Sequence, residues 1–205
     1  MLKVINTILT IFLVFSGTAV LSGSRLDYNA ETTSLDLGTW NNAAVGVSYG
    51  LSYQNTLDSN LIVGGNFSYG EISTALTEHT VMSYGLGLGY MFTNSLDTRA
   101  GQGASFEIGS IFNTTKISGD GTDLSDNSTN VFLRAEMALA PSTVLDLTIG
   151  SPYDDLGNTL SSSIGVNFDI GGMELKVAYL SSKSSLEGVS ANTSGFRLGW
   201  VTRFD

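Results

Sequence analysis

Beyond residue 40, apolar residues alternate with small or polar residues along most of the chain. In the segment 44–53, Val45, Val47 and Tyr49 fall on one parity, whereas glycine, serine and alanine fill the other. Successive side chains of a β-strand point to opposite faces, so this pattern predicts a strand with one apolar face. The same alternation returns in the segments 61–70, 82–92, 105–113, 131–139, 145–150, 160–170, 173–179 and 196–204. The chain is therefore predicted to be all-β.

The lengths of these segments and of the connections between them indicate a barrel. Most of the expected strands are about 9–12 residues long, close to the roughly 9–11 residues of a tilted membrane-spanning strand. Short connections (55–59, 93–98, 140–142, 171–172) alternate with longer ones rich in Ser, Asp, Asn and Gly (72–80, 116–127, 151–158, 182–191). This asymmetry is typical of outer-membrane barrels. With a weaker first strand over 25–32, we expect a single antiparallel up-and-down transmembrane β-barrel of about ten strands, with eight as the alternative.

The polar face of each expected strand helps to decide what the apolar face meets. In a soluble β-sandwich the outer face carries charge, whereas here it carries mainly Gly, Ser, Asn and Ala, which suit a compact lumen. Aromatic residues also gather near the strand ends, as they do at membrane interfaces. We therefore expect the apolar face to meet lipid, and a soluble secreted β-sandwich adhesin remains the alternative from another structural class.

The first 22 residues have the order of a secretory signal peptide. Lys3 precedes the apolar run 4–15, and small residues follow it. The run is about a dozen residues long, shorter than the ~20 that a transmembrane helix needs. We therefore expect residues 1–22 to be a cleaved signal peptide and residues 25–205 to form the barrel domain.

Composition narrows the possible functions. Of the 205 residues only 14% are charged, against about 25% in an average globular domain. The chain has no cysteine, which excludes a disulfide framework and a thiolate metal site. Its formal net charge of -10 argues against a nucleic-acid partner, because a phosphate footprint needs clustered Lys and Arg.

Charged residues on the inward parity predict an ion-paired cluster in the lumen. A connection centred near residue 121 would place Glu107 across from Arg134 or Glu136, and the short turn at Pro141 would bring Glu136 near Asp146. We expect these four side chains to satisfy one another structurally. The functional alternative is a cation-selective constriction, since carboxylate rings favour cations.

The sequence offers little catalytic chemistry. His79 is the single histidine, and it falls in an expected outer loop beside Glu78. A general base needs an orienting group and a nucleophile, and neither is evident here, so a solvated loop residue is the preferred interpretation. We expect no enzyme activity, no cofactor and no metal.

The last strand carries a more specific motif. Residues 197–204 place Gly199 before alternating outward positions, Trp200 and Thr202, and end on the aromatic Phe204. With this ending, the chain resembles the small outer-membrane β-barrel proteins of Gram-negative bacteria, in the OmpA-like, opacity-protein and porin-like group. In that group such a strand is read by the barrel-insertion machinery. Thr202, in place of a bulkier apolar residue, and Asp205, after the aromatic, depart from the usual motif.

These features together predict a non-enzymatic protein of the bacterial outer membrane, exported by the secretory pathway. Its expected role is structural, in the envelope, or one of surface interaction through acidic outer loops, and its lumen is expected to be mostly packed. A narrow passive porin for small solutes or cations is the alternative. The expected partners are outer-membrane lipid and the barrel-insertion machinery. An extracellular ligand would have to be recognised by the outer loops, which this sequence does not specify further.

Overall fold

The computed structural model of the chain describes residues 23–37, 40–73, 77–119, 121–154, 157–186 and 189–204. They form ten antiparallel strands, which confirms the strand count. The strands are β1 (Ser24–Leu37), β2 (Trp40–Thr56), β3 (Leu61–Ser73), β4 (Glu78–Asn94), β5 (Ala104–Gly119), β6 (Thr122–Ala140), β7 (Thr143–Asp154), β8 (Gly157–Ile170), β9 (Met173–Leu186) and β10 (Val189–Phe204). The expected signal peptide, residues 1–22, lies outside the described residues.

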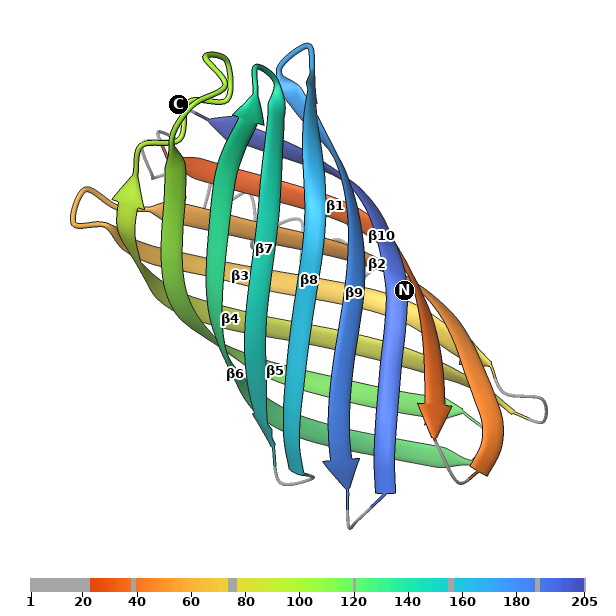
Figure 1. The fold of residues 1–205 in the computed structure, drawn as a ribbon. Helices are drawn as coiled ribbons and strands as arrows, with labels where there is room; N and C mark the ends of the chain where they lie inside the picture. The colour runs from red at the N-terminus through yellow and green to blue at the C-terminus, as the bar shows by residue number, and fades with distance from the viewer. Residues whose placement is uncertain are drawn as a thin grey trace, which may run out of the picture.

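Each strand pairs with its neighbours in sequence, and β1 pairs with β10 to close the barrel (Figure 1). The closing seam runs without a break in register from Ser24 opposite Phe204 to Asp36 opposite Asn192. The soluble sandwich is therefore excluded. No helix among the described residues is long and apolar enough to cross a membrane.

The two ends of the barrel are distinguished by the chain termini. Gly23 and Phe204 lie at one end, which we call the terminal end, and the Gly23 N–H donates to the Phe204 carbonyl oxygen over 2.8 Å. The connections after β2, β4, β6 and β8 lie at this end. The β8–β9 turn consists of Gly171 and Gly172 with φ of 69° and 92°, left-handed values that suit a two-residue hairpin turn.

The expected asymmetry of loop length is wrong. The polar segment 116–127 is mostly continuous β-ladder, in which Lys116 lies opposite Ser125 and Ser118 opposite Asp123. The ladder uses backbone groups alone, so Ser, Thr, Asn and Asp extend the hairpins instead of forming long loops. The longest connection is instead 95–103, at the terminal end.

That connection has a fixed local structure. Asp97 Oδ1 accepts the backbone N–H groups of Arg99 and Ala100 over 3.0 and 2.8 Å. The Ser142 N–H donates to the Thr98 carbonyl oxygen over 2.8 Å, which ties the connection to the β6–β7 turn. Segment 95–103 is therefore an ordered part of the rim at the terminal end.

Large apolar side chains cover the outside of the barrel. Leu86, in the middle of β4, is 71% exposed, and Tyr49 and Leu133 are more than half exposed on other strands. The residues between them on each strand point into the lumen. The inward positions of β2–β5 are rich in glycine (Gly46, Gly50, Gly64, Gly70, Gly85, Gly87, Gly89 and Gly109). At Gly85 a Cβ atom would lie 2.6 Å from the Phe112 carbonyl oxygen, so this position has no room for a side chain.

Candidate functional site

The four charged residues singled out from the sequence lie together in the lumen. Arg134 is at the centre of the group. Its Nη2 atom lies 2.6 Å from Asp146 Oδ2 and 3.0 Å from Glu136 Oε1, and its Nη1 atom lies 3.8 Å from Glu107 Oε1. The arrangement follows from register, because Glu107 is the β5 partner of Arg134 and Asp146 is the β7 partner of Glu136.

Residues of β1, β9 and β10 complete the group, and the cluster predicted from the sequence did not include them. Arg25 of β1 donates from Nη1 to Glu136 Oε1 over 2.7 Å. Lys176 of β9 donates from Nζ to Asp146 Oδ2, also over 2.7 Å. Arg203 of β10 pairs with Glu136 at 2.8 Å and with Glu174 at 2.6 Å.

We call this group the ion-paired layer. It consists of Arg25, Asp27, Glu107, Arg134, Glu136, Asp146, Glu174, Lys176 and Arg203. With four basic and five acidic side chains, its formal charge is close to neutral. The layer is therefore not a ring of carboxylates, and the cation-selective ring considered from the sequence does not describe it.

The layer is tightly buried. Asp146 is 1% exposed and Glu136 5%, and the neighbouring Asn167 is fully buried, with its Nδ2 donating to Glu174 Oε2 over 3.1 Å. Charges this deep are tolerated because each is paired and hydrogen-bonded. Val144 and Val201 also face inward and are almost fully buried. The paired charges therefore fill the side of the lumen that β1, β5, β6, β7, β9 and β10 form at this level.

A second ion pair lies apart from the layer. Arg197 Nη2 and Glu31 Oε2 are 2.8 Å apart on the adjacent strands β10 and β1. Their side chains are 28% and 24% exposed, so water reaches this pair. It forms part of the lumen wall and does not take part in the packed layer.

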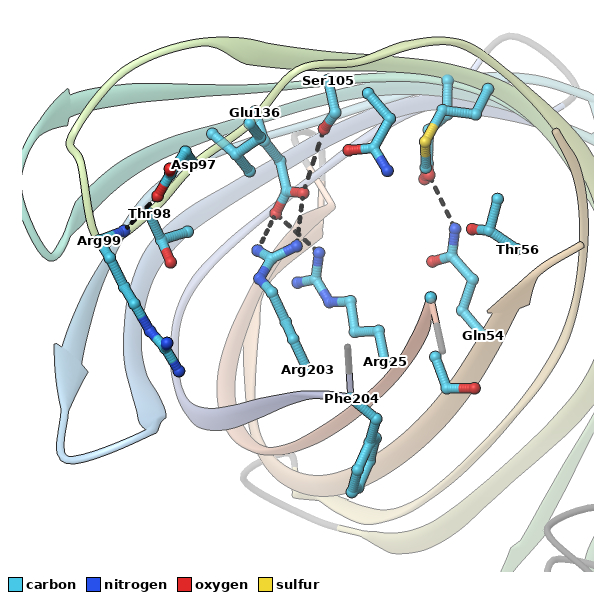
Figure 2. A pocket seen from close by; sticks show the side chains of 16 residues that line it. Arg25, Gln54, Thr56, Asp97, Thr98, Arg99, Ser105, Glu136, Arg203 and Phe204 are labelled. Atoms are coloured by element: carbon cyan, nitrogen blue, oxygen red, sulfur yellow. Dashed lines mark hydrogen bonds and ion pairs between the residues drawn. The ribbon is translucent and has the colours of Figure 1, made fainter. Parts of the chain in front are cut away.

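Two cavities flank the layer. The terminal-end cavity has a volume of about 430 Å³, and its lining includes Arg25, Glu136, Arg203 and residues 96–99 (Figure 2). Figure 2 shows the guanidinium groups of Arg25 and Arg203 converging on the Glu136 carboxylate, with Gln54 on the other side of the cavity. The far cavity, about 460 Å³, lies toward the opposite end, and its lining combines ten serines and threonines with charged residues of the lumen.

His79 does not lie in a loop, contrary to the expectation. It belongs to β4, opposite Ile72 of β3, and is half-buried. Its Nδ1 atom is buried with no hydrogen-bond partner in the described part of the barrel. The polar residues around it suggested a loop, but the hairpin ladder continues through them. Among the described residues, no group of three or more His, Asp or Glu side chains could hold a metal ion.

Comparison with known proteins places the fold. No family model and no curated protein matches this sequence. The β-domain of the Bordetella autotransporter BrkA matches with a TM-score of 0.54 and 12% identity, over 89% of this chain and 100% of that chain. The translocator domain of the autotransporter NalP from Neisseria meningitidis matches with a TM-score of 0.53 and 12% identity, over 98% and 96%. The chain has the fold of an outer-membrane β-barrel. Neisserial surface protein A also matches, over 89% of this chain and 98% of its own, with a TM-score of 0.46 and 14% identity.

The last strand of the barrel presents the motif noted in the sequence. Trp200 and Phe204 are 41% and 36% exposed on the outer face, and Thr202 lies between them. Gly199 faces inward, where a Cβ atom would lie 2.7 Å from the Tyr28 carbonyl oxygen. The geometry presents an aromatic ridge to the surroundings, and recognition of this ridge by the insertion machinery stays a prediction.

Proposed function

We propose that the protein is a non-enzymatic component of the Gram-negative outer membrane that is closed to solutes at rest. The observation that carries this proposal is the ion-paired layer, whose central carboxylate is 1% exposed. Small barrels generally fill their interior with side chains, and here the filling is charged and mutually paired. The protein therefore acts through its outer surface and through the rim that its strand ends form, in envelope integrity or surface contact.

The proposed orientation follows from the export route. A chain delivered from the periplasm after removal of residues 1–22 would keep its termini on that side, so the terminal end faces the periplasm. The opposite end then faces outward. Its strand extensions carry the exposed acidic side chains Glu71, Glu78 and Asp123 and the exposed basic side chains Lys116 and Lys183. Surface contacts would be made by this charged rim, and lipid would cover the apolar face between the two ends.

Single-channel recording of the folded protein in planar lipid bilayers tests the closed state. We expect no conductance steps above the background of protein-free detergent, because buried and paired side chains separate the terminal-end cavity from the far cavity. Insertion of folded protein is verified by heat-dependent gel mobility of the recovered proteoliposomes. Stable, reproducible steps from the wild-type chain would contradict the proposal and favour the narrow porin.

A further inference from the structure

The ion-paired layer is unevenly distributed around the lumen. Its nine members come from β1, β5, β6, β7, β9 and β10; β8 contributes none, and neither do the adjacent strands β2, β3 and β4. Those three strands present glycine at many inward positions, so their side of the lumen has little side-chain filling of its own. Closure on this side depends on the few larger side chains that the three strands do carry.

Gln54 of β2 occupies the place where the cavities come closest. It lines the terminal-end cavity and the far cavity. It also lines a third cavity of about 60 Å³, with Ile62 and Gly87. This cavity lies against the inward glycines of β3 and β4, Gly64, Gly87 and Gly89, which we call the glycine wall. Glu107 lines both larger cavities as well. The partition between the two halves of the lumen is therefore one side chain thick at Gln54 and Glu107.

These two side chains are joined by a hydrogen bond, in which Gln54 Nε2 donates to Glu107 Oε2 over 2.7 Å. The other carboxylate oxygen of Glu107 is 3.8 Å from Arg134 Nη1, the longest Arg134 ion pair in the layer. Glu136 by contrast is held by three arginines at 3.1 Å or less. The Gln54–Glu107 contact is thus less firmly anchored than the rest of the layer.

We propose that the Gln54–Glu107 hydrogen bond closes a cation path that follows the glycine wall from one cavity to the other. Removing the amide side chain joins the cavities and leaves the Glu107 carboxylate at the narrowest point. A carboxylate at a constriction favours cations over anions. This inference goes beyond the proposed function, because it assigns closure to one contact and gives the opened barrel a selectivity.

The test compares three neighbouring inward positions of β2 in planar bilayers. Gln54→Ala is expected to conduct in small steps. Its open probability should exceed that of the wild type at least about tenfold, because the loss of a hydrogen bond to a charged group shifts an equilibrium by about that factor. Ser52→Ala and Thr56→Ala are matched controls, since Ser52 lines only the far cavity and Thr56 only the terminal-end cavity. Both controls are expected to stay silent. Gln54→Ser serves as a second opening variant if Gln54→Ala folds poorly.

Selectivity provides an independent readout. In a potassium chloride gradient, the reversal potential of Gln54→Ala should favour potassium, and Glu107→Gln added to that variant should reduce the preference. A folded Gln54→Ala and Gln54→Ser that are both silent would overturn the inference, as would controls that conduct equally. Conductance by the wild-type chain would contradict the proposed closed state. The inference about Gln54 would then stand if Gln54→Ala raised the open probability about tenfold above wild type, and would be overturned if it did not.

Discussion

Asp146→Ala is expected to lower the free energy of unfolding by about 3–5 kcal/mol, the usual cost of removing one partner from a buried ion pair. Asp146 accepts from Arg134 Nη2 at 2.6 Å and from Lys176 Nζ at 2.7 Å, so its loss leaves two buried cations without this carboxylate. The measurement is equilibrium unfolding by guanidinium chloride in lipid vesicles, followed by tryptophan fluorescence.

The control for this variant is Glu31→Ala, which removes a carboxylate from the partly exposed pair with Arg197. Its cost is expected to be about 0–1 kcal/mol, because water screens exposed ion pairs. If the two variants lost similar free energies of unfolding, the ion-paired layer would be no less hydrated than the Arg197–Glu31 pair. That result would contradict the packed lumen.

Leu86→Arg is expected to destabilise the barrel in a bilayer by about 2–4 kcal/mol, the cost of a basic side chain at the hydrocarbon midplane. Leu86 lies halfway along β4 and is 71% exposed, so its replacement disturbs little packing within the protein. The cost therefore comes from the surroundings of the barrel. Unfolding in lipid vesicles measures it.

Leu57→Arg is the matched control, since Leu57 is also exposed but lies in the β2–β3 turn at the terminal end. Its effect should be within about 1 kcal/mol of zero, because charged substitutions cost little near the interface. If Leu86→Arg were as mild as Leu57→Arg, hydrocarbon would not cover the middle of β4.

The sequence predicted the barrel because one physical signal repeats along it. Side chains of a strand alternate between faces, so a wall between lipid and lumen leaves a period of two in every strand. Even the weak first strand was recognisable from Leu26, Tyr28 and Ala30 against Asp27, Asn29 and Glu31. The outer connections were harder, because polar composition does not distinguish a loop from a hairpin that extends beyond the membrane.

The lumen was predictable only where strand neighbours decide it. Glu136 and Asp146 face each other across a two-residue turn, and their proximity follows from counting residues. Arg25 and Glu136 are 111 positions apart and meet across the barrel. That contact depends on barrel radius, stagger and side-chain reach, which alternation alone does not specify. Gln54 was missed for the same reason, since its importance comes from the cavities on either side of it.

The central claim, that apolar side chains face acyl chains and small or charged ones face the lumen, is tested most directly by spin labels in lipid bilayers. Labels would be placed on cysteines at the outward positions Leu86, Leu133 and Ile164, and at the inward serines Ser52, Ser68 and Ser163. Power saturation should show high oxygen accessibility for the outward labels and low oxygen accessibility for the inward ones. Equal accessibility in the two sets, or the reverse order, would contradict the account.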